Sequence, residues 1–76
     1  MKDIIKVDDA NFEQVTASGI VLIDFYADWC GPCRMLTPIL EALAAEMNGQ
    51  VVVAKLDVDQ ATKTTTNFQI TSVPTL

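Results

Sequence analysis

The sequence predicts a single small α/β domain with a three-stranded parallel sheet. Three short runs rich in β-branched and apolar residues alternate with three segments of helical pattern, in the order βαβαβα. This alternation implies a parallel sheet whose crossover connections are right-handed. The chain has 76 residues and 50% of them are hydrophobic, which suits one domain with a modest core and excludes disorder as the default expectation.

The first two strands are expected near the N-terminus. Residues 4–7 form a short β-like run, and Asp8 or Asp9 is expected to cap a short helix that follows. A Ser-Gly pair ends this helix. Residues 20–26 are then almost continuously apolar, a pattern typical of a central parallel strand that is covered on both faces.

The clearest helix follows this second strand. Pro32 lies in its first turn, where proline is tolerated, and Asn48 with Gly49 supplies its end. Five apolar residues at positions i, i+3, i+4, i+7 and i+11 form one stripe, typical of a helix that packs on a core: Leu36, Ile39, Leu40, Leu43 and Met47.

The last strand and helix are predicted after residue 50. Residues 51–58 are rich in β-branched side chains and form the third strand. Asp59 is expected to cap a final helix that runs to about Phe68. That helix is predicted to be weak, because its four threonines have poor helix propensity.

Charge and composition exclude several classes of function. The net charge is −5 and no basic cluster exists, so the sequence predicts no basic surface that would bind nucleic acid or an anionic membrane. The acidity either steers the protein toward a basic partner or, as we favour, is that of an ordinary soluble protein. Charges interrupt the N-terminus, so it is not a signal peptide, and the longest apolar run is too short to span a bilayer. A cytoplasmic location is expected.

Cys30 and Cys33 form a C-x-x-C pair at the start of the long helix. Residues at i and i+3 face each other there, so the two sulfurs can reach bonding distance. At Cys30 the unpaired backbone N–H groups and the helix dipole favour the thiolate, which is the species that attacks a disulfide. Cys33 lies one turn inside, is expected to be the more buried thiol, and resolves the mixed disulfide.

Three alternative roles of the cysteine pair are less favoured. A zinc site needs about four ligands, and two cysteines without a histidine complete one only if a dimer shares two pairs. A structural disulfide that closes so short a loop stabilises little. The third alternative is a chance spacing with no role. The redox function is therefore preferred, with no metal and no bound cofactor expected.

Asp24 interrupts the most hydrophobic strand, on the face that Leu22 and Tyr26 share. A buried carboxylate is costly unless it is paired, and burial raises its pKa, so it can exchange a proton with a nearby thiol. Lys55 interrupts the third strand in the same way and is a candidate partner. The alternative is an ion pair that only allows the carboxylate to be buried, and the pattern leaves both possibilities open.

Trp29, which directly precedes the cysteine pair, and Pro74, near the end of the sequence, have two interpretations each. Trp29 either shields the thiol and offers apolar surface to a protein substrate, or is a half-buried packing residue. Pro74, by pattern alone, is a turn proline or an edge-strand proline.

Residues 25–34, which read F-Y-A-D-W-C-G-P-C-R, resemble the active-site segment of thioredoxins. The W-C-G-P-C block is highly specific, and Asp24, Pro38 and residues 53–59 and 72–76 also match. The resemblance extends from residue 3 to the end of the chain. It implies a thioredoxin-like α/β fold.

The resemblance also implies roles for individual residues. Cys30 corresponds to the nucleophile and Cys33 to the resolving cysteine, assisted by Asp24 with Lys55 as its neighbour. The Gly-Pro pair between the cysteines resembles the reducing members of the family, and the peptide bond before Pro74 is implied to be cis and to face the dithiol. The substrate-binding residues are expected to be Trp29, Gly31, Pro32, Val73 and Pro74.

The sequence departs from the family in two respects. Tyr26 stands where many bacterial members have tryptophan, and family members continue past residue 76 with further strands and a final helix. The expected fold is therefore an incomplete thioredoxin in a single domain of residues 1–76. Family analogy implies the strand order third, first, second, which leaves residues 20–26 at an edge. This exposed edge predicts a homo-oligomer or domain-swapped assembly.

The expected function is protein disulfide reduction of the thioredoxin type, with disulfide-containing proteins as substrates and an NADPH-dependent thioredoxin reductase to recharge the dithiol. The alternative is a truncated thioredoxin that acts as a binding or self-assembling module and is poorly recycled by that reductase.

Overall fold

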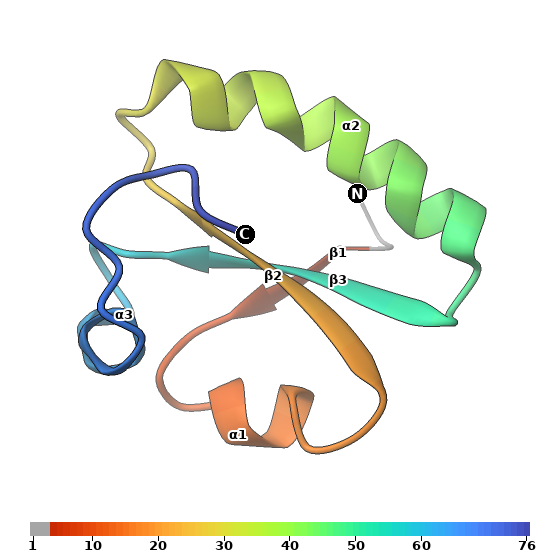
Figure 1. Ribbon diagram of the computed structural model, residues 1–76, viewed down its shortest axis with the longest axis horizontal. Helices are drawn as coiled ribbons and strands as arrows, with labels where there is room; N and C mark the ends of the chain where they lie inside the picture. The colour runs from red at the N-terminus through yellow and green to blue at the C-terminus, as the bar shows by residue number, and fades with distance from the viewer. Residues whose placement is uncertain (1–3) are drawn as a thin grey trace.

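The computed structural model describes residues 4–76 and confirms the alternating α/β architecture (Figure 1). Residues 1–3 lie outside the described part. The three strands and the long helix begin and end within one residue or so of their expected positions. In chain order the elements are β1 (Ile4–Val7), α1 (Phe12–Val15), β2 (Ile20–Tyr26), α2 (Gly31–Met47), β3 (Val51–Asp57) and α3 (Thr62–Asn67).

All three strands are parallel, but their order is β1-β3-β2. The expected order of third, first, second is therefore wrong, because β3 is the central strand. The apolar pattern of residues 20–26 predicts a central strand, and this is also wrong: β2 lies at an edge, as the family analogy implies. Burial explains this order. Val53, Ala54 and Leu56 of β3 are all 0% exposed, whereas β2 begins at Ile20 with 67% of its surface exposed. The strand whose side chains are apolar on both faces takes the position that is covered on both sides.

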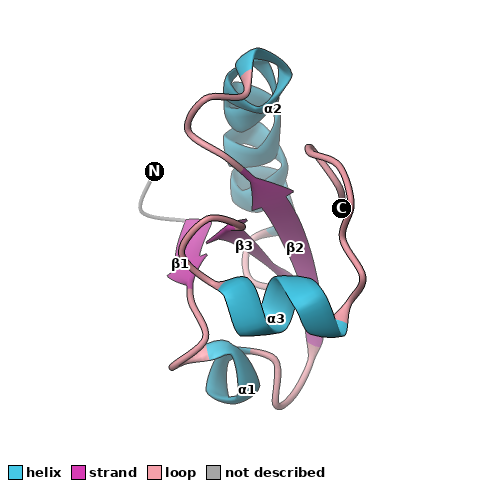
Figure 2. Cartoon of the chain, turned by 90° about the vertical axis from the view of Figure 1, so that its left-hand side faces the viewer, coloured by secondary structure: helices cyan, strands magenta, loops and turns pink. Residues whose placement is uncertain are grey.

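Helices cover both faces of the sheet, with α2 on one face and α1 and α3 on the other (Figures 1 and 2). Because side chains alternate along a strand, each strand contributes to two separate packed layers. On the α2 face, Leu22 and Val53 pack with Leu40 and Ala44. Phe25 belongs to the layer on the opposite face. Asp24 and Tyr26 therefore share the α2 face with Leu22, as the alternation predicts.

The helix α2 packs through a narrower stripe than the spacing predicts. Leu40 and Ala44 are buried, but Ile39 is 63% exposed, so its assignment to the packed stripe is wrong. Ile39 lies outside the surface of α2 that faces the sheet, and no other element of the described chain covers it. Asn48 and Gly49 end the helix with φ values of 49° and 87°, in the left-handed region that favours these two residues.

The helix caps differ from the local caps that the sequence predicts. Asn11, not Asp8 or Asp9, occupies the N-cap position of α1, without a side-chain cap hydrogen bond. Asp8 instead accepts hydrogen bonds within its own turn. Asp9 caps α3: its carboxylate accepts from the backbone N–H of Lys63 at 3.1 Å, and from the backbone N–H and hydroxyl of Thr64 at 2.9 and 2.7 Å. Asp59 is not a cap of α3.

The C-terminal residues return to the edge of β2. Phe25 and Thr75 form an antiparallel bridge with two backbone hydrogen bonds, of 2.8 Å from the Phe25 N–H and 3.2 Å from the Thr75 N–H. This bridge places the segment that contains Val73 and Pro74 beside the end of β2 that leads to the cysteines. The fold thus brings residues 24–33 and 70–76 to one end of the sheet.

Candidate redox site

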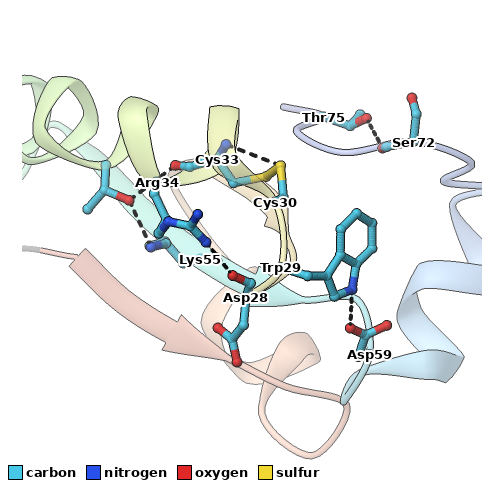
Figure 3. The surroundings of a disulfide bond; sticks show 10 residues. Asp28, Trp29, Cys30, Cys33, Arg34, Lys55, Asp59, Ser72 and Thr75 are labelled. Atoms are coloured by element: carbon cyan, nitrogen blue, oxygen red, sulfur yellow. Dashed lines mark hydrogen bonds between the residues drawn. A yellow bond between two sulfur atoms is a disulfide. The ribbon is translucent and has the colours of Figure 1, made fainter.

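Cys30 is the N-cap residue of α2 and forms a disulfide with Cys33 (Figure 3). Its backbone is extended, with φ −92° and ψ 111°, and its sulfur accepts a hydrogen bond from the Cys33 N–H at 3.2 Å. The Cα atoms are 5.3 Å apart, within the ordinary range for a disulfide. The sulfur of Cys30 therefore takes the place that a serine or aspartate oxygen takes at other helix N-termini.

Both sulfurs lie in a small apolar cluster. Cys30 is 5% exposed and Cys33 is 2% exposed, so Cys33 is the more buried, by a small margin. Ala27 completes the buried cluster, with Tyr26, Val58 and Val73 packed around it. The disulfide is thus shielded on most sides, and substrates must approach over the residues that flank Cys30.

Trp29 is the most prominent of these flanking residues. Its side chain is 69% exposed, so the interpretation of a half-buried packing residue is wrong. Its indole Nε1–H donates a hydrogen bond of 2.8 Å to Asp59 Oδ2, which fixes the ring although its faces are open. Trp29 also lines a groove of about 170 Å³ whose other walls include Val58, Ile70 and Val73. In Figure 3, Trp29 and Asp59 lie on one side of Cys30, with Arg34 and Lys55 on the other.

The other predicted binding residues also lie close to the dithiol. The Val73–Pro74 peptide bond is cis, as the resemblance implies, and Val73 packs against the cysteine cluster. Gly31 and Pro32 form the first turn of α2, where Pro32 is exposed. The five residues expected to bind substrate therefore surround Cys30, although their roles remain predictions.

Asp24 is completely buried in β2, six residues before Cys30. Its side chain is 0% exposed, and neither carboxylate oxygen has a hydrogen-bond partner in the described chain. Burial raises the pKa of Asp24, and the positive charge of Lys55 opposes this rise only in part. A carboxyl in this state holds its proton to higher pH than an exposed aspartate does.

Lys55 lies directly opposite Asp24 on the neighbouring strand but does not form an ion pair with it. The two residues are register partners of β2 and β3. The Lys55 ammonium instead donates a hydrogen bond of 3.1 Å to Thr37 Oγ1 and lies 4.4 Å from the centre of the Tyr26 ring. A direct ion pair therefore does not account for the burial of Asp24.

Three further residues of this region, which the sequence does not mark as site residues, hold its parts in place. Thr37 holds Lys55, Asp59 orients Trp29, and Arg34 donates a hydrogen bond of 2.6 Å to the carbonyl of Asp28 in the turn before Cys30. Thr37 lies four residues after Cys33, so helical spacing alone places it on the face of α2 that carries the resolving cysteine. Asp59 and Arg34 carry no comparable signal.

The described residues contain neither a metal site nor a membrane-spanning helix. Within residues 4–76, no group of three or more histidine, cysteine, aspartate or glutamate side chains could hold a metal ion. In the same part of the chain, no helix combines the length and the apolar character needed to cross a bilayer.

A disulfide that closes between the N-cap and the first turn of a helix, beside a parallel sheet and an exposed groove, is the arrangement typical of a thiol–disulfide oxidoreductase. The family model for thioredoxin matches residues 3–76. The thioredoxins of Staphylococcus haemolyticus strain JCSC1435 and Staphylococcus aureus strain Mu50 are each 48% identical over 73 residues, covering 96% of this chain and 70% of the relative. The chain belongs to the thioredoxin family.

Proposed function

We propose that this chain reduces disulfides in other proteins, with Cys30 as the nucleophile and Cys33 as the resolving thiol. The observation that carries the proposal is the hydrogen bond from the Cys33 N–H to the Cys30 sulfur at the N-terminus of α2. A sulfur in this position is stabilised as the thiolate by the N–H group and the helix dipole when the pair is reduced. The groove beside Trp29 and Val73 offers an apolar surface for an extended segment of the substrate.

The reaction proceeds by two exchanges of thiol for disulfide. The Cys30 thiolate attacks one sulfur of the substrate disulfide, which forms a mixed disulfide and releases the other substrate sulfur as a thiolate. Cys33 then loses its proton to Asp24 and attacks the Cys30 sulfur, which forms the Cys30–Cys33 disulfide and releases the second substrate thiolate. Two electrons pass from the dithiol to the substrate, which leaves the chain in the disulfide form of this structure.

The dithiol must be regenerated by an external reductant. Thioredoxin reductase, with NADPH as the source of two electrons, is the expected partner in the cytoplasm. A dye-labelled disulfide substrate tests the whole cycle, driven first by dithiothreitol and then by the reductase with NADPH. Turnover with both reductants supports the proposal, and absence of turnover with dithiothreitol contradicts the exchange chemistry itself.

A second candidate function is a binding or self-assembling module. It is favoured by the edge of β2 that faces away from β3. There Phe25 pairs with Thr75, but the preceding residues of β2 have no partner strand on that side within the described chain. An open strand edge is a site for pairing with another chain. Turnover with dithiothreitol but not with the reductase favours this function. Light scattering coupled to size exclusion, over a tenfold concentration range, then decides whether copies associate, and a monodisperse 8.3 kDa species contradicts self-assembly.

A further inference from the structure

The ammonium of Lys55 is held by α2 rather than by the carboxylate that lies opposite it. It contacts the Thr37 hydroxyl, at 3.1 Å, and the ring of Tyr26. We propose that Thr37 is a positioning residue: its hydroxyl fixes the ammonium of Lys55, the register partner of Asp24, and so controls proton exchange between Asp24 and Cys33. This inference rests on the proposed function, because it concerns the step in which Cys33 resolves the mixed disulfide.

The hydrogen bonds of Thr37 have a fixed direction. A lysine ammonium can only donate, so the Thr37 oxygen accepts from Lys55. The single hydroxyl proton of Thr37 is donated to the backbone carbonyl of Cys33, at 3.3 Å. Lys55, Thr37 and the Cys33 carbonyl therefore form one chain of hydrogen bonds that ends on the backbone of the resolving cysteine. The hydroxyl both accepts and donates, whereas an aliphatic side chain of the same shape does neither.

This anchor restricts a side chain that would otherwise extend into water. Lysine has four rotatable bonds and a strongly hydrated head group, so an unanchored ammonium favours solvent. The hydroxyl from α2 and the aromatic ring from β2 hold it from two sides. A small cavity of about 90 Å³ opens at this point, lined by Cys33, Thr37 and Lys55 among others, and gives the head group room to leave.

The position of the ammonium matters because Asp24 has no hydrogen-bond partner within the described residues. Its charged form is favoured by the positive charge of Lys55, which lowers the pKa of Asp24 against the larger effect of burial. If Lys55 moves into water, this support weakens and Asp24 holds its proton to higher pH. Other groups that face the region come from every neighbouring element: Tyr26 and Asp28 from β2 and its turn, Asp57 from β3, and Cys33 and Arg34 from α2.

The test measures Asp24 directly, in the disulfide form, where the cysteines do not titrate. The carboxyl carbon of Asp24 is followed by NMR against pH in the wild-type chain, in Thr37→Val and in Thr37→Ser. We expect Thr37→Val to raise the titration midpoint by about half a pH unit or more, because the effect of the nearby charge is reduced. Thr37→Ser keeps the hydroxyl and should retain the wild-type midpoint.

Two controls separate positioning from a general structural effect. The first control is Thr16→Val. The Thr16 hydroxyl also donates to the carbonyl four residues earlier, that of Phe12, at 2.8 Å, but it lies far from Lys55 in the fold. Its removal should leave the titration midpoint of Asp24 unchanged. In a Lys55→Met background, Thr37→Val should have no further effect on the midpoint, since the residue through which it acts is gone. Thr37→Ala replaces Thr37→Val if the valine variant does not give a folded spectrum.

The proposal is overturned if Thr37→Val leaves the midpoint unchanged, lowers it, or raises it equally in the Lys55→Met background. A lowered midpoint would mean that Thr37 holds the ammonium away from Asp24. The acid limb of the pH profile for disulfide reduction should shift in the same direction as the midpoint. Because the NMR titration needs no turnover, a chain that shows the shift but reduces no disulfide would contradict the proposed function alone.

Discussion

The N-termini of α2 and α3 are both capped by side chains, but the two caps come from very different places in the chain. At α2, the sulfur of Cys30 accepts a hydrogen bond from Cys33, three residues further on. At α3, the carboxylate of Asp9 accepts hydrogen bonds from Thr64, which lies 55 residues away in the sequence. The same need to satisfy free N–H groups is thus met once by a neighbour and once by a distant segment.

The difference separates a cap that takes part in chemistry from a cap that holds the fold. The atom that caps α2 is the proposed nucleophile, so its hydrogen bond acts on reactivity. The atom that caps α3 joins the turn after β1 to the helix that leads into the groove at Ile70 and Val73. We expect changes at the first cap to alter the rate of exchange and changes at the second to alter the stability of the fold.

The sharpest test of this division is Cys30→Ser. Serine is itself a good N-cap residue, so α2 should remain capped and the urea midpoint should stay close to that of the reduced wild type. Disulfide reduction should fall by about a thousandfold or more, because the nucleophile is gone. The dye-labelled assay driven by dithiothreitol measures the loss. A variant that unfolds would show that the sulfur is needed for more than chemistry.

Cys33→Ser is the matched control for the order of attack. This variant keeps the nucleophile but lacks the thiol that resolves the mixed disulfide, so it should accumulate covalent complexes with substrate proteins. Cys30→Ser should not. Non-reducing electrophoresis with mass mapping identifies the complexes, and equal trapping by the two variants contradicts the assigned roles.

Asp24→Asn tests a buried carboxylate that does not cap a helix. The change removes a buried charge that lacks a partner in the described chain, so the urea midpoint should rise, and exchange near neutral pH should slow by about tenfold as the proton acceptor is lost. Burial raises the pKa of Asp24, so the folded chain favours the protonated acid. The contribution of this preference to stability is present below the unfolded value of about 3.9 and is lost as pH rises through the folded pKa.

The gain in stability of Asp24→Asn over the wild type should therefore be greater at pH 8 than at pH 5. Urea melts at the two values measure it. If the variant and the wild type unfold at the same urea concentration at both values, Asp24 is not an unfavourable buried group, and its proposed role as proton acceptor loses its physical basis.

Asp9→Ala breaks the distant cap and has the opposite dependence on pH. The hydroxyl and backbone N–H of Thr64 hold the pKa of Asp9 below its usual value. The stability that Asp9 contributes is therefore present above the unfolded value and is lost as pH falls through the lower folded pKa. We expect Asp9→Ala to lower the urea concentration at the unfolding midpoint by roughly 0.5 M at pH 7.

The control for this variant is Glu46→Ala, which removes the same charge from an exposed position on α2 and should change the midpoint little. Alkylation of Cys30 should proceed in Asp9→Ala as in the wild type. Slower alkylation in Asp9→Ala would show that the two caps are not independent.

The smallest expected effect concerns the thiolate of Cys30 in the reduced wild-type chain. Iodoacetamide labelling followed against pH should give a midpoint below the value of about 8.5 for a free cysteine, because the helix N-terminus favours the thiolate. Mass mapping should place the first label on Cys30. Preferential labelling of Cys33 would reverse the assignment.

The contrast between the caps also explains what could be predicted from the sequence. The bounds of the strands and of α2 depend on periodicity within ten or twenty residues, and they were predicted closely. The helix α1 is shorter than the expected segment between Asp8 or Asp9 and the Ser-Gly pair. The capping roles expected of Asp8, Asp9 and Asp59 were wrong, because an aspartate before a helical pattern has the same local signal whether it caps that helix or reaches a distant one.

The predictions of the strand order and of the packed face of α2 were wrong for a related reason. The family analogy places residues 4–7 in the centre of the sheet, and the apolar pattern favours residues 20–26, but the centre is β3. Which strand is central depends on the burial of both faces in the folded sheet, and the apolar runs of β2 and β3 are too alike for the sequence to rank them. Ile39 fits the helical spacing of the stripe but lies beyond the sheet-facing surface. In the site, the cysteine pair was found by its C-x-x-C spacing and Asp24 because it interrupts an apolar strand. Thr37 has only its helical spacing from Cys33 as a signal, and Asp59 has none.

The three-residue separation of Cys30 and Cys33 has a consequence for how the protein responds to its own oxidation. Residues at this spacing are neighbours on a helix whether or not their sulfurs are joined. Making or breaking the bond therefore opens no loop and separates no two elements of the fold. We therefore expect the oxidised and reduced forms to have nearly the same shape, so this pair is poorly suited to signal its redox state through a change of fold.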